Sequence, residues 1–242
     1  MKILCIIPIF NEKARINEVI KNIIKFIELD KYKIDFLLID NGSNDGTSEI
    51  LKKSKLNVIT LRRNKGVGYS LLLGLKISNK KKYDILVHMA GNNKMKPIDI
   101  HFLIKPLIEK DYDFVSGSRF LMKDNYTTNP IFRKISIRLL SKIFSYLFRK
   151  KITDATCGFR AFKIKKIIKF FYLFNKKKFY TYGYEYYSYG KVLLSKSIKS
   201  CEESVEMKYP KKGKYSKIRP IIDWYPIING YLESLTDKIK ID

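Results

Sequence analysis

Short apolar runs alternate along this sequence with stretches of helical periodicity. Three runs are almost continuously apolar, as strands buried on both faces are: residues 2–8 (KILCIIP), 34–40 (IDFLLID) and 85–89 (ILVHM). Between them, apolar residues recur every three or four positions, which is typical of one face of a helix. Strands that alternate with helices predict an α/β protein with a mostly parallel sheet and helices on both of its faces.

The same patterns extend the predicted order of elements. Further strands are expected at 56–61 and 112–117, and helices at 16–27, 48–53, 66–78 and 98–109. We expect one domain over residues 1–220, followed by a C-terminal tail or helix over 221–242, because 242 residues suit a single α/β domain. The chain begins directly with a strand pattern, so we expect no secretory leader. The apolar runs all fall short of the roughly 20 residues that span a bilayer.

The charge of the chain restricts its partners. There are 49 Lys and Arg residues against 23 Asp and Glu, a formal net charge of +26. Such an excess favours anionic partners, although a general bias toward Lys, Ile, Asn and Tyr accounts for part of it equally well. The basic residues are spread along the chain and no nucleic-acid-binding motif is present, so we expect no specific nucleic-acid partner. The three cysteines are far apart and indicate neither a disulfide framework nor a zinc site.

The segment 131–151 (IFRKISIRLLSKIFSYLFRKK) combines helical apolar spacing with many basic residues and contains no acidic residue. A basic amphipathic helix is a candidate for lying on an anionic membrane surface. The alternative is an ordinary helix that docks its apolar stripe on the sheet. Both remain open, and we treat 131–174 as an amphipathic insert that would place the protein peripherally on a membrane.

Four polar motifs follow the predicted strands or lie beyond them. They are 8–12 (PIFNE), 39–47 (IDNGSNDGT), 117–119 (GSR) and 154–160 (DATCGFR). The carboxyl ends of parallel strands meet at one edge of a sheet, and ligands bind there in open α/β folds. These motifs therefore predict a site at that edge.

In their order and spacing the motifs resemble those of family 2 glycosyltransferases with the GT-A fold, and most closely the dolichyl- or polyprenyl-phosphate mannose and glucose synthases. The resemblance covers roughly residues 3–218. It implies a nucleotide-sugar donor and an acceptor that is a polyprenyl phosphate or a lipid-linked glycan. The donor-binding residues that it implies, together with basic candidates in the same loops, are Pro8, Phe10, Glu12, Asp40, Lys65, Gly91, Asn92, Asn93, Arg119, Lys211 and Lys217. Gly158, Phe159 and Arg160 are expected on the acceptor side.

One part of the family pattern is missing. The resembled family carries an Asp-x-Asp that holds a divalent metal on the donor diphosphate, whereas Ala90 and Asn92 occupy those two positions here. Asn92 is at most a weak ligand, since hard cations prefer carboxylates. We expect no regular metal site, with Lys94 and neighbouring cations neutralising the diphosphate instead. The alternatives are that Mg²⁺ or Mn²⁺ binds weakly through the donor diphosphate, or that the protein binds donor without catalysis.

The resemblance implies an inverting glycosyl transfer at the cytoplasmic face of the membrane. A lipid phosphate acceptor is already an anion and requires no strong base, whereas a sugar hydroxyl requires one. Asp154 is the first candidate for that base and Glu185 the second, and Lys94 is the candidate for meeting the charge of the leaving group.

Overall fold

A computed structural model describes residues 1–122, 131–170, 175–209 and 222–237. Across this part of the chain the strands form one sheet in the order β3-β2-β1-β4-β6-β5-β7. The strands are β1 (Ile3–Ile9), β2 (Asp35–Asp40), β3 (Asn57–Thr60), β4 (Ile85–His88), β5 (Phe114–Ser118), β6 (Arg160–Lys163) and β7 (Ser200–Ser204). The pairs are parallel except where β6 lies antiparallel between β4 and β5. The predicted mostly parallel α/β sheet is therefore confirmed.

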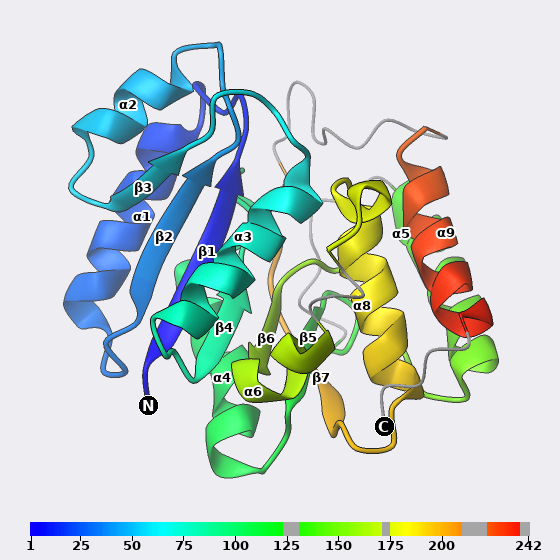
Figure 1. The fold of residues 1–242 in the computed structure, drawn as a ribbon. Helices are drawn as coiled ribbons and strands as arrows, with labels where there is room; N and C mark the ends of the chain where they lie inside the picture. The colour runs from blue at the N-terminus through cyan, green and yellow to red at the C-terminus, as the bar shows by residue number, and fades with distance from the viewer. Residues whose placement is uncertain (123–130, 171–174, 210–221, 238–242) are drawn as a thin grey trace.

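Helices cover both faces of this sheet (Figure 1). One face carries α1 (Ile16–Leu29), α2 (Thr47–Lys53) and α4 (Ile100–Glu109). The other face carries α3 (Val67–Lys80), α5 (Ile131–Phe148), α6 (Ile164–Ile167), α8 (Gly183–Leu194) and α9 (Trp224–Thr236). Short 3₁₀ turns lie at Pro97–Asp99, Ile168–Phe170 and Lys177–Phe179.

The alternation of side chains along β1 explains the two cores. Leu4 and Ile6 pack with α3 and α8 on one face, while Cys5 and Ile7 pack with α1 and α4 on the other. A strand buried on both faces in this way reads as a continuous apolar run, which is the pattern that predicted it.

The pair α8 and α9 was not predicted as such. Every residue of α8 from Gly183 to Leu193 is buried, so this helix shows no amphipathic stripe. Glycine allows the two helices to approach closely: a Cβ on Gly190 would overlap the Ser234 hydroxyl and lie 2.7 Å from the Ser234 Cβ. Across the described ranges, none of the helices has both the length and the apolarity needed to cross a bilayer.

Candidate active site

The loops after β1 and β2 are joined by hydrogen bonds at the carboxyl edge of the sheet. The Asn11 N–H donates to the Ser43 hydroxyl at 3.0 Å, and the Glu12 N–H donates to the Thr47 hydroxyl at 2.9 Å. Asp40, at the end of β2, is fully buried. Its carboxylate accepts from the Ser43 N–H at 3.0 Å and from the Ser48 hydroxyl. Asp40 thus lies at the predicted edge, where its carboxylate shapes the turn that follows.

The segment before α3 holds this turn in place through hydrogen bonds. Asn41 donates to the Asn64 side chain and accepts from the Lys65 N–H, both at 2.9 Å. The Lys65 side chain is exposed at the rim, with its ammonium 4.5 Å from the centre of the Tyr69 ring. Pro8 and Phe10 are half-buried at the end of β1.

The loop after β4 is closely packed against β1. A Cβ on Gly91 would lie 2.5 Å from Ile9 Cγ1, so only glycine fits there without displacing the Ile9 side chain. The side-chain oxygen of Asn92 accepts from the Lys94 N–H at 3.3 Å, and that of Asn93 accepts from Asn22 of α1 at 3.0 Å. Both predicted donor-binding asparagines therefore use their oxygens to fix the loop.

Three cations from distant parts of the sequence gather beside this loop, and we call them the cationic cluster: Arg15, Lys94 and Arg133. Arg15 immediately precedes α1, and Arg133 lies in the first turn of α5. The Lys94 ammonium is 4.8 Å from the centre of the Tyr209 ring, and the Arg133 guanidinium is 5.6 Å from the same point.

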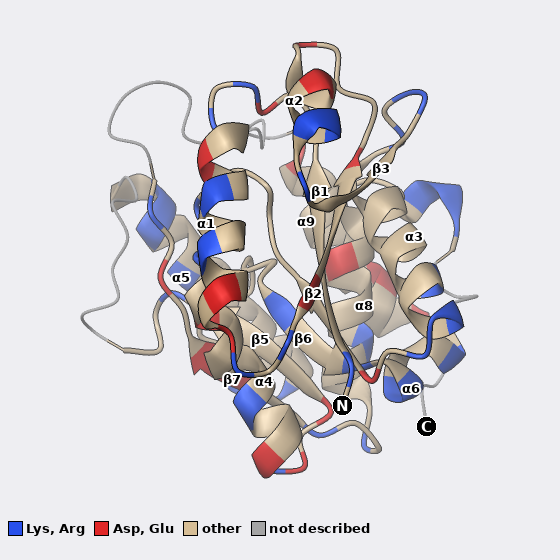
Figure 2. Cartoon of the chain, turned by 90° about the vertical axis from the view of Figure 1, so that its left-hand side faces the viewer, with Lys and Arg blue, Asp and Glu red and all other residues tan. Residues whose placement is uncertain are grey.

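The three cations act on one another electrostatically. Burial, followed by the nearby Arg133 and Arg15 guanidinium groups and opposed by Glu12, lowers the pKa of Lys94 to about 8. Arg119 contributes in the same direction. Glu12 is buried and forms an ion pair with Arg15 at 3.1 Å. Figure 2 shows that blue Lys and Arg residues also occur on α1, α5 and α6, so charge alone does not mark the site.

The donor atoms at this loop do not fit a divalent metal. Ala90 has no ligating side chain, and the Asn92 oxygen already accepts a backbone hydrogen bond. The searched part of the chain contains no group of three or more His, Cys, Asp or Glu side chains that could hold a metal ion. The ammonium of Lys94 in the same loop would repel a cation.

Arg119 and Asp154 form a buried ion pair under the cluster. They are 2% and 0% exposed, and the Arg119 Nε and Nη2 atoms donate to the carboxylate at 2.6 and 2.7 Å. Thr156 and the Arg119 backbone donate to the same carboxylate, and Arg119 Nη1 donates to the Tyr209 hydroxyl at 2.7 Å. Glu202 accepts from the backbone N–H groups of residues 153 and 154. This network fixes the position of Tyr209, and with it the ring over which Lys94 and Arg133 lie.

Glu185 lies beside Gly158, which belongs to the segment 154–160 that also carries Asp154. Burial raises the pKa of its carboxyl to about 7, with Arg160 opposing the shift. The side chain packs against Gly158, where a Cβ would lie 2.6 Å from Glu185 Oε1. Arg160 donates to the Glu185 carbonyl and stacks at 4.4 Å on the Tyr189 ring, while Phe159 is buried in the core.

The predicted site residues thus separate into two groups that the segment 154–160 connects. The donor-side residues gather at the ends of β1, β2 and β4. Asp154 is paired with Arg119, and burial raises the pKa of Glu185. Lys211 and Lys217 lie outside the described residues.

Residues 4–171 match the sequence profile described as glycosyl transferase family 2. The chain belongs to this family. It is 32% identical over 219 residues to an uncharacterized protein of Methanocaldococcus jannaschii, covering 85% of this chain and 88% of that one. It is 29% identical over 174 residues to the UDP-N-acetylglucosamine–dolichyl-phosphate N-acetylglucosaminyltransferase of Methanococcus voltae, covering 65% and 67% of the two chains.

Solved structures support the fold. Glucosyl-3-phosphoglycerate synthase of Mycobacterium tuberculosis, in complex with Mn²⁺, UDP-glucose and phosphoglyceric acid, matches with a TM-score of 0.68 at 16% identity, over 97% of this chain and 79% of that one. The predicted GT-A fold and family are confirmed, and the chain is a glycosyltransferase. Sequence reasoning did not place Arg15 or Arg133 in the site, although Arg15 stands three residues after Glu12, at the spacing of a helical ion pair.

Proposed function

We propose that this glycosyltransferase moves a sugar, with inversion, from a nucleotide-sugar donor to a polyprenyl phosphate at a membrane surface. The donor-side motifs at the carboxyl edge of the sheet support the first half of this proposal. The similar Methanococcus voltae protein, which is named for transfer to dolichyl phosphate, supports the second.

The observation that carries the proposal is the arrangement of side chains around α5. The helix packs on the protein through a narrow row: Ile137, Ser141, Phe144 and Phe148. A second apolar row is exposed: Ile131, Phe132, Ile135, Leu139, Ile143, Tyr146 and Leu147. Successive helical residues are rotated by about 100°, so the exposed row is centred opposite the buried one.

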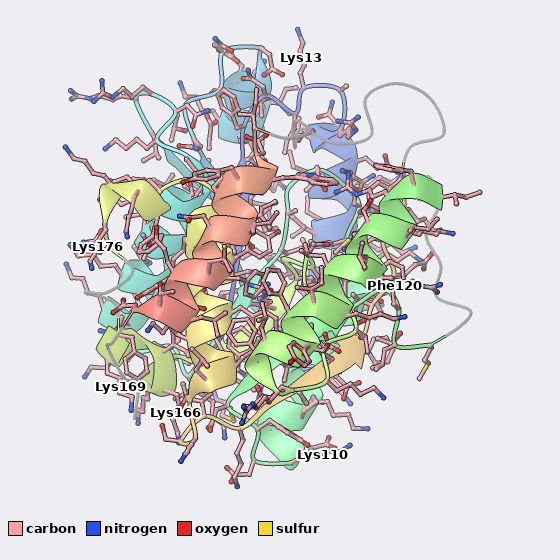
Figure 3. The ribbon with its side chains drawn as sticks, turned by 90° about the vertical axis from the view of Figure 1, so that its right-hand side faces the viewer. Lys13, Lys110, Phe120, Lys166, Lys169 and Lys176 are labelled. Carbon is pink, nitrogen blue, oxygen red and sulfur yellow. The ribbon has the colours of Figure 1, made fainter. Side chains whose placement is uncertain are left out.

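Helix α9 also exposes apolar side chains. This helix contacts α5 through Tyr231 and Phe144, whose ring centres are 4.1 Å apart, and it exposes Trp224, Tyr225 and Leu232. Figure 3 shows the two helices on the same side of the molecule. The exposed apolar row runs along one face of α5, and an exposed apolar surface of this kind marks an interaction site.

Charge complementarity selects an anionic membrane as the occupant. Arg138 and Lys142 flank the exposed row and are themselves exposed, while Arg138 also lies 5.4 Å from the ring of Phe120. No acidic residue occurs in α5. Basic residues beside an apolar helix face bind anionic headgroups while the apolar side chains enter the interface. We place the protein peripherally, at the cytoplasmic face where nucleotide sugars are available.

The chemistry follows from the acceptor. A phosphate oxygen of the polyprenyl phosphate attacks the anomeric carbon, and the bond from that carbon to the donor diphosphate breaks. The electron pair leaves with the diphosphate, and attack from the opposite face inverts the anomeric centre. The acceptor is already an anion, so no base is required. Were the acceptor a glycan hydroxyl, Glu185 would be the group to accept its proton.

The test is transfer of radiolabel from UDP-N-acetylglucosamine, UDP-glucose or GDP-mannose into lipid, in vesicles that contain a polyprenyl phosphate and anionic lipid. We expect labelled lipid and sedimentation with the vesicles. The variant with Ile135→Ser and Leu139→Ser should lose both, whereas Leu29→Ser, at an exposed leucine of α1, should lose neither. Nucleotide binding without transfer to any acceptor would instead favour a protein that binds donor without catalysis.

A further inference from the structure

We infer that the cationic cluster of Arg15, Lys94 and Arg133 binds the diphosphate of the donor in place of a divalent cation. The inference rests on the proposed function, because it states how the donor site holds its most highly charged group.

The geometry brings the three cations to one place from three separate elements. Lys94 comes from the loop after β4, Arg15 from the residue before α1, and Arg133 from the first turn of α5. Lys94 and Arg133 both lie over the Tyr209 ring, at 4.8 and 5.6 Å from its centre. The Lys208 N–H donates to the Lys94 carbonyl at 3.0 Å, which holds the segment that carries Tyr209 against the loop.

Positive charge predominates around Lys94 among the residues that the structure describes. Of the charged groups there that shift its pKa, Arg133, Arg15 and Arg119 are cations and Glu12 is an anion. Glu12 is already paired with Arg15, and Arg119 with Asp154. Together with burial, this excess of positive charge lowers the pKa of Lys94 to about 8. A ligand with several negative charges would relieve the repulsion, and a diphosphate is such a ligand.

The same positions do not suit a metal. Ala90 offers no ligand, and Asn92 Oδ1 is held by the Lys94 N–H. A divalent cation beside the Lys94 ammonium would be repelled by the group that attracts the diphosphate. When the bond from the anomeric carbon breaks, its electron pair remains on the diphosphate oxygen. The cluster then faces the charge that develops there.

The experiment measures binding of inorganic pyrophosphate and of UDP by calorimetry in EDTA. Pyrophosphate is included because it tests the cluster without knowledge of the base or the sugar. We expect the wild-type protein to bind pyrophosphate in EDTA, with no gain when Mg²⁺ or Mn²⁺ replaces EDTA. Lys94→Met, which keeps an unbranched side chain on the Tyr209 ring, and Arg133→Ala should each weaken binding about tenfold or more. Lys25→Ala, at an exposed position of α1, should leave it unchanged.

Thermal unfolding of each variant shows whether a loss of binding comes from misfolding. Pyrophosphate binding that requires Mg²⁺ or Mn²⁺, or folded Lys94→Met and Arg133→Ala variants that bind as the wild type does, would overturn the inference. Sugar transfer that continues while pyrophosphate binding depends on metal would refute the cluster and leave the proposed function standing. Metal-free pyrophosphate binding without transfer to lipid would refute the proposed acceptor and leave the cluster standing.

Discussion

Replacing Glu185 by Gln removes a carboxyl group that the folded protein keeps protonated up to neutral pH. The residue is 9% exposed, and burial raises its pKa from 4.5 to about 7, with Arg160 opposing. Between pH 4.5 and about pH 7, the folded chain binds up to one more proton than the unfolded chain. Stability therefore falls as pH rises, by about 1.4 kcal/mol per pH unit. The stability that is linked to this bound proton is fully present below pH 4.5 and is lost by about pH 8, a total on the order of 3 kcal/mol.

Glutamine stays uncharged over this whole pH range, so the variant does not lose stability at this position as pH rises. We expect the free energy of unfolding of Glu185→Gln, minus that of wild type, to be about 2 to 3 kcal/mol larger at pH 8 than at pH 5, so that the variant is relatively more stable at pH 8. Urea unfolding at the two pH values measures the difference. Glu49→Gln, at an exposed position of α2, is the matched control. The stability of Glu49→Gln relative to wild type should change by less than about 0.5 kcal/mol between pH 5 and pH 8.

The reasoning fails if the stability of Glu185→Gln relative to wild type is the same at pH 5 and pH 8, because the carboxyl would then titrate in the folded protein as it does in the unfolded chain. The same variant also separates the two acceptor classes. Transfer to a polyprenyl phosphate should survive the substitution, whereas transfer to a glycan hydroxyl should be lost.

Three further predictions concern the ion pair, the helix pair and the membrane. Asp154→Asn should lower the free energy of unfolding by about 3 kcal/mol, because it leaves the buried Arg119 guanidinium without its counter-charge; unchanged urea stability would contradict this positioning role. Gly190→Ala should cost about 1 to 3 kcal/mol by overlap with Ser234, whereas Gly183→Ala, where a Cβ meets its nearest neighbour at 3.4 Å, should cost less; equal thermal shifts would refute the difference. Binding to anionic vesicles should weaken as salt rises and be absent with neutral vesicles, as sedimentation would show; equal binding to both would refute the electrostatic part.

The parts of the fold that could be predicted are those in which burial produces a regular pattern of apolar residues in the sequence. β1, β2 and β4 are buried on both faces, so they appear as continuous apolar runs, and the neighbouring amphipathic helices follow from their spacing. β6 has only four residues and begins with Arg160, and nothing local to it encodes an antiparallel direction. The buried helix α8 is rich in tyrosine on all sides, so periodicity did not reveal it either.

The sequence could predict that the polar motifs of the candidate site gather in one place, because polar motifs after parallel strands meet at one edge of the sheet. Only some of the residues that make up the candidate site could be predicted. Arg15 and Arg133 are more than a hundred residues apart, and the folded chain alone brings them beside Lys94. From the sequence, Asp154 ranked first and Glu185 second as the candidate base. The structure distinguishes them, because Asp154 is paired with Arg119 and Glu185 is not.

The helix α5 carries Arg133 in its first turn and the exposed apolar row along the rest of its length. An element shared by two binding surfaces links them thermodynamically when binding at one surface changes the order or position of that element. Any ordering of α5 by a membrane would change the affinity for the donor diphosphate, and bound donor would change the affinity for the membrane by the same factor. A transferase built in this way would engage its donor most tightly where its lipid acceptor is found.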